Sequence, residues 1–439
     1  MTTQYDPEQL ARELAELREE HRRVLQSTSY RLGKLLVGAL RSPGALIRLP
    51  GGLYHLFKRR RAHRQAPRPG SVQFAEVQTR IRSLAAGVRA KPESEFIFLF
   101  SGTTFVQGIR GNRPIRQTQA LLRQGVPVLF SYHRSRSDEP LPTYEQEGLV
   151  QSPVDITMQL LDEIGAADLG DTRKLYIVSY PYPGIDKSVA MFRRHGWKVI
   201  YDCRDDWEAF SKVGMARWFN AGTEQVLVSE CDATFCVAGP LVEKMRSLAP
   251  GSRVELMPNA VEADFLPEGY QRQPANGRRI VGYFGHLAAA WFDWDALAEI
   301  ARSCPQYVFE VIGHSAPQDL QLPDNVQLLG PKPWDQLHEF ARRWSAAIIP
   351  FRMGPLADGV DPIKIYEYLA FGLPVVSFRM PQISHYPYTT TVDNVSAFCD
   401  ALDDACATQT DRAVIDAFLS HNTWEVRVRQ LLAVMTQST

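Results

Sequence analysis

The sequence has 439 residues, of which 45% are hydrophobic and 22% charged, values typical of folded proteins that exclude a globally disordered chain. This length exceeds that of one ordinary domain and predicts two large domains with an additional segment. Basic and acidic residues both number 49, so only the distribution of charge is informative. No acidic residue occurs between Glu20 and Glu76, whereas twelve lysines and arginines lie in that interval.

Cysteine spacing and hydropathy bear on the compartment. The six cysteines have no metal-type spacing, and the polar, acidic start of the chain is unlike a secretory signal. No uncharged apolar run reaches the roughly eighteen residues that a membrane-spanning helix needs. We therefore expect a reduced, cytoplasmic protein without a transmembrane segment.

The first seventy residues form the additional segment. Apolar residues at three-and-four spacing from Leu10 to Val24 predict a short helix of coiled-coil type. Because so short a helix is marginal alone, we expect it to dock or to pair within an oligomer.

Residues 29–68 alternate apolar runs with basic residues and end near Lys58-Arg-Arg-Arg61. Three interpretations fit this composition: an interfacial membrane segment, a solvated basic linker, and a nucleic-acid contact. We favour the first because apolar residues are interleaved with the charges, and we expect no nucleic-acid partner. The favoured partner is an anionic membrane surface, which would place the protein peripherally on the inner face of the cell membrane.

Strands alternate with helices from Glu76 onward, which predicts a parallel, doubly wound α/β sheet. Strands are expected at residues 95–100, 126–132, 175–179 and 233–237, and a helix at residues 113–125. The loop after the first strand contains Gly108 and Arg110 and would lie at the ligand-binding edge of the sheet. Its glycines do not form G-x-G-x-x-G, so the loop predicts no dinucleotide site.

A strand beginning at Lys198 runs into three carboxylates, Asp202, Asp205 and Asp206, with Arg204 among them. Crowded carboxylates raise one another's pKa and a neighbouring arginine lowers it, so such clusters are costly unless used or well solvated. The alternative is a helix N-cap, which suits Asp206.

A second series of strands follows at residues 279–286, 307–314, 325–330 and 346–352 and predicts a second Rossmann-like sheet. Gly285 and Gly313 end the first two strands, and a glycine turn there can present backbone amides to a diphosphate. A helix is expected from Lys332, and an amphipathic one from Asn422 to Met435.

Residues 361–377 read Asp-Pro-Ile-Lys-Ile-Tyr-Glu-Tyr-Leu-Ala-Phe-Gly-Leu-Pro-Val-Val-Ser. They predict a helix that starts at Pro362, ends at Gly372 and leads into a buried strand. Lys364 and Glu367 share one face near the helix start. Free N–H groups and a lysine suit a phosphate, and a carboxylate one turn later suits sugar hydroxyls. An ordinary surface ion pair is the simpler alternative.

This stretch resembles the nucleotide-sugar signature of GT-B glycosyltransferases, in the branch with Pro-x-Lys-x-x-Glu-Tyr-Leu-Ala-x-Gly-x-Pro-Val-Val. Pro258-Asn-Ala-Val261 resembles the turn that closes the first domain of that fold. Tyr201-Asp-x-x-Asp205 resembles an acidic acceptor-side motif of bacterial teichuronic-acid and other envelope-polysaccharide glycosyltransferases. The resemblance is to retaining, family-four-like enzymes and extends from about residue 95 to 435.

The resemblance implies the GT-B fold, in which two Rossmann-like doubly wound domains face a cleft, here with an N-terminal helical extension. The implied division is a basic helical segment (1–70), an acceptor domain (71–265), a nucleotide-sugar domain (266–420) and a C-terminal helix that crosses back (421–439). The implied reaction moves a sugar from a nucleotide-sugar donor to a hydroxyl of a lipid-linked cell-envelope glycan, with retention. No metal or other cofactor is implied.

The resemblance also implies roles for individual residues. Asp205 would contact the acceptor hydroxyl and Asp202 would orient it. On the donor side, Lys364 would bind the phosphates and Glu367 the ribose or donor hydroxyls. The remaining candidates on the donor side are Gly285, Gly313, Arg352, Pro362, Ile363 and Tyr366, and those on the acceptor side are Gly108, Arg110 and Asp206.

Two departures from the family pattern keep alternatives open. The first glutamate of the family's paired-glutamate motif would fall at Gly359. His286 and Leu287 stand where many relatives carry an arginine and a lysine, so that charge would come from Lys364 or Arg352. The chain could therefore be a sugar-nucleotide epimerase of the same fold, or a non-catalytic assembly subunit that gathers partners through its N-terminal helix.

Three further histidines, His314, His338 and His385, lack metal-ligand spacing. We interpret them as structural or solvent-facing residues.

Overall fold

A computed structural model describes residues 71–436 apart from 92–93, 109–110, 274–276 and 278. The basic N-terminal segment, its expected helix and the acceptor-side candidate Arg110 lie outside the described residues. The chain divides into two compact units. One combines Met1–Ala75 with Arg134–Leu141, and the other combines Glu76–His133 with Pro142–Thr439.

The described part of the first unit is held by polar contacts. The Gln73 side-chain amide donates to the Glu139 carbonyl at 3.0 Å. The Arg134 guanidinium donates to Gln73 Oε1 at 2.9 Å and to the same carbonyl at 3.1 Å. Helix α4 (Val72–Arg89) begins in this unit and continues into the second.

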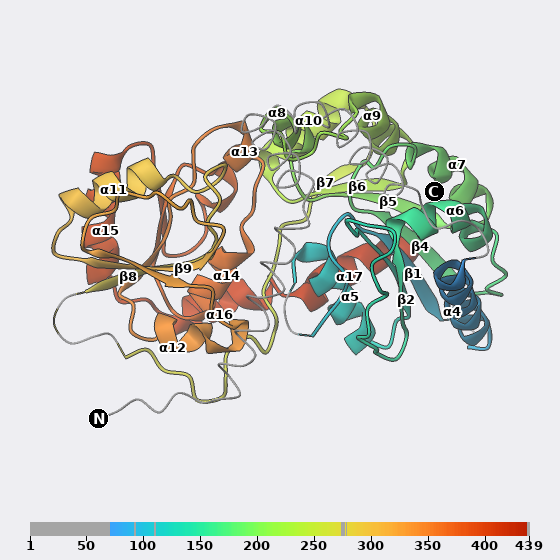
Figure 1. Cartoon of the computed structure of the whole chain (residues 1–439), viewed down its shortest axis with the longest axis horizontal. Helices are drawn as coiled ribbons and strands as arrows, with labels where there is room; N and C mark the ends of the chain where they lie inside the picture. Colours follow the sequence, from blue (N-terminus) through green and yellow to red (C-terminus); the bar gives the residue numbers. More distant parts are fainter. Residues whose placement is uncertain (1–70, 92–93, 109–110, 274–276, 278, 437–439) are drawn as a thin grey trace, which may run out of the picture. The chain divides into compact units, whose positions relative to one another are not determined.

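The second unit contains a seven-stranded sheet in which all strands are parallel, in the order β3-β2-β1-β4-β5-β6-β7 (Figure 1). Its strands are almost continuously buried, as in a parallel sheet covered on both faces. The strands are β1 Glu95–Phe100, β2 Val128–Tyr132, β3 Leu149–Pro153, β4 Arg173–Val178, β5 Lys198–Cys203, β6 Ala233–Cys236 and β7 Val254–Leu256. The helices are α5 Arg113–Arg123, α6 Val154–Gly165, α7 Asp186–Arg194, α8 Trp207–Lys212, α9 Ala221–Glu230 and α10 Gly239–Leu248.

The same unit contains a six-stranded parallel sheet in the order β10-β9-β8-β11-β12-β13. Its strands are β8 Ile280–His286, β9 Val308–His314, β10 Val326–Gly330, β11 Ala346–Ile349, β12 Val375–Phe378 and β13 Thr389–Val392. The α-helices of this half are α11 Trp294–Ser303, α12 Leu337–Ala341, α13 Pro355–Asp358, α14 Ile363–Ala370, α15 Val395–Ala407, α16 Arg412–Ser420 and α17 Trp424–Ala433. Short 3₁₀ turns are η1 Trp334–Gln336, η2 Pro381–Ile383 and η3 Val434–Thr436.

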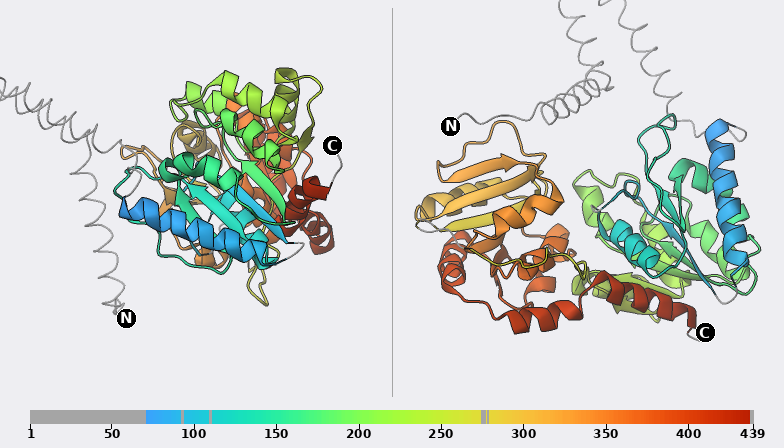
Figure 2. Two further views of the ribbon diagram at one scale, coloured as in Figure 1. Left: turned by 90° about the vertical axis from the view of Figure 1, so that its right-hand side faces the viewer. Right: turned by 90° about the horizontal axis from the view of Figure 1, so that it is seen from below.

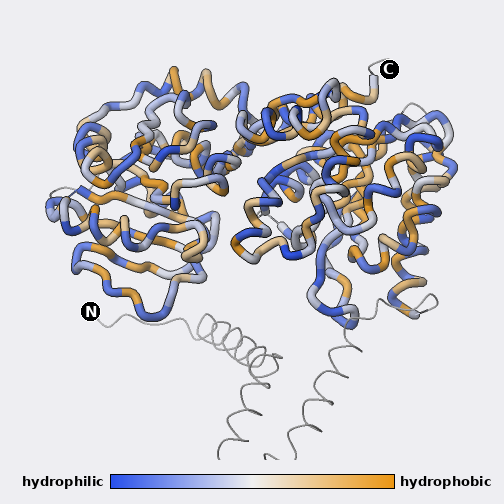
Figure 3. Tube along the Cα trace, turned by 90° about the horizontal axis from the view of Figure 1, so that it is seen from above, coloured by the Kyte–Doolittle hydropathy of each residue, from blue (hydrophilic) through white to orange (hydrophobic). Residues whose placement is uncertain are grey.

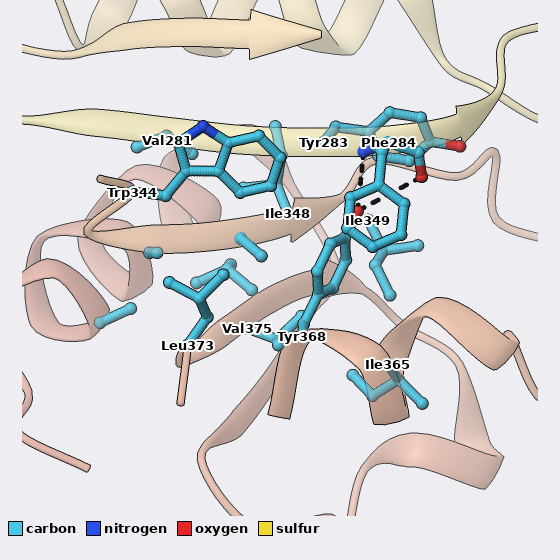
Figure 4. Packing of buried hydrophobic residues seen from close by; sticks show 14 of the residues in the cluster. Val281, Tyr283, Phe284, Trp344, Ile348, Ile349, Ile365, Tyr368, Leu373 and Val375 are labelled. Atoms are coloured by element: carbon cyan, nitrogen blue, oxygen red, sulfur yellow. Dashed lines mark hydrogen bonds between the residues drawn. The ribbon is translucent and has the colours of Figure 1, made fainter. Parts of the chain in front are cut away.

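The core of the second sheet fixes helix α14 against strand β8 (Figure 4). The Phe284 N–H donates to the Tyr368 hydroxyl at 2.9 Å, so the buried tyrosine keeps a polar partner. A Cβ at Gly282 would lie only 1.9 Å from the Trp344 ring, so this glycine lets the ring lie directly on the strand. The helix that carries Lys364 is thereby held beside the carboxyl end of β8.

Helix α17 returns along the first sheet and packs against α5 (Figures 1 and 2). The Trp424 ring is fully buried in the hydrophobic core of that sheet. Arg123 and Glu425 add an ion pair at 2.6 Å. Figure 3 shows hydrophobic residues recurring along the strands of both sheets, which agrees with their burial.

The two parallel sheets confirm the predicted α/β, doubly wound class, but two strands were not predicted. Strands β3 and β13 have the sequences Leu-Val-Gln-Ser-Pro and Thr-Thr-Thr-Val, and each lies at a sheet edge. β13 is partly exposed, whereas β3 buries the polar residues Gln151 and Ser152, so neither has an apolar pattern. The predicted helix 113–125 ends at Arg123, because Gly125 takes a φ of 75°. No helix in the described part of the chain is long and apolar enough to cross a membrane.

The strand order reverses between β1 and β4 in one sheet and between β8 and β11 in the other. Ligands of doubly wound sheets bind beyond the carboxyl ends of strands at such points. The ends of β1 and β8 are therefore the first places to examine for a site.

Candidate functional site

A cavity of about 270 Å³ opens at the carboxyl ends of β8 and β9. Helix α14, the loop after β10 and the start of helix α5 complete its wall. Its lining residues are Gly111, Arg116, Phe284, Gly285, Ile312, Gly313, His314, Pro331, Lys332, Trp334, Leu337, Ile363, Lys364 and Glu367. The cavity thus lies at the reversal of strand order in the second sheet.

Two glycines form the floor of this cavity. Gly285 has a φ of 147°, and a Cβ there would lie 2.8 Å from Lys364 Cε and 3.2 Å from its ammonium nitrogen. A Cβ at Gly313 would lie 1.9 Å from the Gly285 carbonyl oxygen. The two strand ends can therefore meet each other and the lysine only because both positions lack a side chain.

The Lys364 ammonium lies over two aromatic rings, 4.7 Å from the Phe351 centroid and 5.3 Å from that of Tyr283. Burial lowers the pKa of this lysine to about 8, and the nearby Glu367 carboxylate partly opposes that shift. Within the described residues no carboxylate comes within ion-pair distance of the ammonium. A cation held in this way is suited to an incoming anion.

The Glu367 carboxylate lies one turn after Lys364 on α14 and also lines the cavity. Its Oε1 accepts from Trp334 Nε1 at 3.2 Å and from Arg116 Nη2 at 3.5 Å. Arg116 is itself buried, pairs with Glu262, and lies over the Trp334 ring with its Cζ 5.2 Å from the centroid. Helix α5 of the first sheet therefore contributes a buried cation to the cavity wall.

Asp361 fixes the start of α14. Its carboxylate accepts from the Asn259 N–H at 2.6 Å and from the Tyr366 hydroxyl at 2.8 Å. The Tyr386 hydroxyl donates to the other oxygen at 3.1 Å. Burial raises the pKa of this carboxyl to about 6 against the lowering effect of these bonds. The segment that follows the first sheet is in this way hydrogen-bonded directly to the residue that precedes helix α14 by two positions.

The acidic cluster at the end of β5 divides into three different environments. Asp202 is completely buried, and both its oxygens accept from Arg113, at 2.7 and 2.9 Å. Asp206 caps helix α8 by accepting from the Ala209 N–H at 2.9 Å, and it pairs with Lys244 at 2.7 Å.

Asp205 is the member of this cluster that stays accessible. Its side chain is 26% exposed, and its closest ionic partner is Arg204 at 3.6 Å. Loss of hydration raises the pKa of Asp205 to about 6, because Arg204 and Arg113 offset only part of the cost.

The comparisons with known proteins agree with this geometry. Residues 278–407, which contain the whole second sheet, match the family model described as "Glycosyl transferases group 1". The curated protein TuaH of Bacillus subtilis (strain 168), assigned as a teichuronic acid biosynthesis glycosyltransferase, is 26% identical over 245 residues. That match covers 51% of this chain, and the chain spans 60% of the length of TuaH.

Solved structures share the fold at low sequence identity. WaaG, "a glycosyltransferase involved in lipopolysaccharide biosynthesis", superposes with a TM-score of 0.55 at 12% identity, over 78% of this chain and all of WaaG. A trehalose-6-phosphate protein from E. coli bound with UDP-2-fluoro glucose gives 0.56 at 11% identity, over 79% and 100%. The chain has the GT-B fold, and its residues 278–407 are similar to the group 1 glycosyltransferases.

Several of the donor-side candidates predicted from the sequence converge on the cavity of this glycosyltransferase domain. Gly285, Gly313, Ile363, Lys364 and Glu367 all line it.

Three other donor-side candidates lie outside the cavity lining. The Arg352 side chain turns to the Ala289 carbonyl at 3.0 Å and to Asp293 at 3.6 Å. The Tyr366 side chain, within α14, is buried, and its hydroxyl donates to the Asp361 carboxylate. Pro362 is the residue that precedes α14. Arg352 thus does not supply the missing charge in this structure.

On the acceptor side, Gly108 is exposed in the loop after β1 and takes a φ of 31°. Gly359, where the family's first glutamate would fall, faces the first sheet: a Cβ there would lie 3.1 Å from that of Asp206 and 3.3 Å from Leu241 Cδ2.

The sequence interpretation gave no site role to the cavity-lining residues Arg116, Trp334 and His314. Arg116 and Trp334 carried no local signal, because their partner Glu367 is far away in the sequence. His314 is exposed to solvent, which agrees with its interpretation as structural or solvent-facing, and it also lines the cavity. Its position directly after Gly313, at a strand end, is the signal that could have identified it. In the described residues no group of three or more histidine, cysteine or carboxylate side chains is placed to hold a metal ion.

The contrast between Asp202 and Asp205 can be tested by unfolding. Replacing Asp202 by alanine leaves the buried Arg113 cation without its partner, so we expect the free energy of unfolding to fall by about 3–5 kcal/mol. Replacing Asp205 by alanine removes a carboxylate that is partly exposed to solvent, so the free energy of unfolding should fall by less than about 1 kcal/mol. Urea denaturation measures both, and equal losses would contradict the structural role given to Asp202.

Proposed function

We propose that the protein is a glycosyltransferase that moves a sugar from a nucleotide-sugar donor to a hydroxyl of a cell-envelope glycan. The observation that carries the proposal is the Lys364 ammonium, which lies in the cavity without a paired carboxylate in the described part of the chain. Such a cation fits a diphosphate, and Glu367, one turn further along α14, fits sugar or ribose hydroxyls.

The proposed chemistry places the donor in the second half of the chain, within residues 266–420. Negative charge develops on the leaving diphosphate, so a preorganised cation lowers the barrier more than it tightens the ground state. Retention and independence from metals follow from the family resemblance. Asp205, accessible at the end of β5, is the acceptor-side carboxylate in this proposal, and Asp202 positions it through the buried bonds to Arg113.

The envelope acceptor is supported by the relatives. TuaH is assigned to teichuronic acid biosynthesis, and WaaG is described as acting in lipopolysaccharide biosynthesis. Both polymers belong to the cell envelope, and a lipid-linked glycan made on the cytoplasmic face is the acceptor that fits the basic, apolar segment of residues 29–68.

The donor side is tested with a panel of nucleotide sugars, measuring binding by calorimetry and turnover by release of the nucleotide. Lys364→Ala should lower turnover about 10²- to 10³-fold, because it removes charge stabilisation of the leaving group. Glu367→Ala should chiefly weaken donor binding. Lys187→Ala and Glu243→Ala, at exposed positions of the first half, serve as controls and should leave both quantities unchanged.

The same panel separates the two alternative functions. Interconversion of donor sugars without any acceptor would favour the epimerase. Absence of binding across the panel would favour the non-catalytic subunit and would overturn the proposal.

The acceptor side is tested through Asp205. Asp205→Asn should abolish transfer to an added glycan acceptor while the donor dissociation constant stays within about twofold of wild type, since the residue lies outside the donor cavity. If Asp205 accepts the proton, the transfer rate of the wild type should fall as the pH drops through about 6, where this carboxyl becomes protonated. Glu208→Gln is the matched control, because that carboxylate is already paired with Lys212 and Lys244.

Membrane association is tested by flotation with vesicles that contain anionic lipid. Replacing the four residues Lys58-Arg-Arg-Arg61 by glutamine should reduce the bound fraction of the full-length chain markedly, because each basic residue near the surface contributes about 1 kcal/mol. The loss should be mimicked in the wild type by raising the salt concentration. Equal flotation of both proteins would show that this basic cluster does not hold the protein at the membrane.

A further inference from the structure

Two histidines end two adjacent strands of the second sheet, β8 and β9. His286 follows Gly285 at the end of β8, and His314 follows Gly313 at the end of β9. The two residues are register partners in the parallel pair, and their ring centroids lie 5.0 Å apart. The turns that carry them are the glycine turns of the cavity floor, so the imidazoles lie at its rim.

The histidine pair is next to Lys364. The ammonium nitrogen lies 3.2 Å from the position that a Cβ would take at Gly285, the residue directly before His286. His314 is itself part of the cavity wall. Three groups that can carry positive charge therefore meet at one place, on β8, β9 and α14.

The hydrogen bonds of these imidazoles leave nitrogen atoms free to contact a ligand. His314 Nδ1 shares a hydrogen bond with the Ser315 hydroxyl at 2.9 Å, which leaves Nε2 for another partner. Ser315 takes a φ of 69°, an uncommon conformation for a residue with a side chain. In the part of the chain described, neither His314 Nε2 nor the His286 ring has a hydrogen-bond partner.

The groups that face the pair have an excess of positive charge. His286 is faced by His314 and Lys364, and its carbonyl accepts from the Tyr283 hydroxyl. The remaining charged groups of the cavity are Arg116 on α5, Lys332 after β10 and Glu367 on α14. Desolvation, His314 and Lys364 together lower the pKa of His286, so in the empty site this imidazole is mainly neutral at pH 7.

We propose that His286 and His314 are diphosphate-binding residues, and that they take up protons when the nucleotide-sugar donor binds beside Lys364. A doubly charged diphosphate favours the imidazolium form, which the empty site disfavours at His286. Donor binding is therefore coupled to proton uptake, and the affinity rises as the pH falls. This inference rests on the proposed function, since it concerns the donor of that reaction.

The inference accounts for charge that the other residues do not supply. Arg352 lies outside the cavity and Arg116 is already paired with Glu262, so Lys364 and Lys332 are the cavity cations left to face a dianion. In this proposal the histidine pair adds charge when the ligand binds. The empty site thereby avoids holding three unpaired cations together.

The test is calorimetric titration of the full-length protein with UDP-glucose, UDP-glucuronate, GDP-mannose and ADP-glucose between pH 5.5 and 7.5. The diphosphate diester of these probes keeps its charge across this range, so any proton change belongs to the protein. Repeating each titration in two buffers with different ionisation heats gives the number of protons taken up. Staying below pH 7.5 limits the contribution of Lys364, whose pKa is about 8.

For the probe that binds, we expect uptake of about one proton near pH 7 and a dissociation constant that rises by several-fold per pH unit. His286→Asn and His314→Gln should each weaken binding about tenfold at pH 6, and the double variant should lose the proton uptake. His286→Arg should restore affinity, because arginine keeps its charge, while reducing the proton uptake. His195→Ala, an exposed histidine at the end of α7, is the control and should behave as the wild type.

The outcomes distinguish this inference from the proposed function. Binding without proton uptake, or uptake that survives in the double variant, would overturn the role of the histidines and leave the glycosyltransferase proposal standing. Failure of every nucleotide sugar to bind would overturn both. A loss of binding in His286→Arg equal to that in His286→Asn would indicate a purely structural role and would also contradict the inference.

Discussion

The contact between the ends of β8 and β9 and helix α14 is the constraint on which the rest of the site depends. Gly313 lies against the Gly285 carbonyl, and Gly285 lies against the Lys364 side chain, with no room for a Cβ at either position. Tyr368 holds the helix in this place by bonding the backbone of β8. Any side chain at the two glycines would push the lysine away from the strand ends and fill the floor of the cavity.

A second constraint ties the first sheet to this helix. Asn259, in the segment that leaves the first sheet, donates to the Asp361 carboxylate directly before α14, and Arg113 donates to the Asn259 side chain. Arg113 is the same residue that neutralises Asp202 at the end of β5. The acidic cluster at the end of β5 and helix α14 thus share one buried polar network, in which a loss at one position removes partners at the others.

The sequence was sufficient to predict the fold class and several residues of the cavity wall, because strand–helix alternation and the motif from Asp361 to Ser377 are local patterns. It was not sufficient for Arg116, whose role depends on Glu262 and Glu367 more than a hundred residues away. Nor did it identify the partner of Asp202, since only the tertiary structure determines which carboxylate Arg113 reaches. Edge strands such as β13 lacked the apolar pattern that identifies central strands.

The missing first glutamate and the unusual histidines form one consistent arrangement. At Gly359 the backbone packs on Asp206 and Leu241, so a side chain there would press against the first sheet instead of reaching the cavity. Among the described residues that line the cavity, Glu367 is the one carboxylate, beside Arg116, Lys332 and Lys364. A site with that balance gains little from further permanent cations, which would repel one another when it is empty. In the proposal above, the histidine pair at the ends of β8 and β9 avoids this cost because it gains charge when the diphosphate binds.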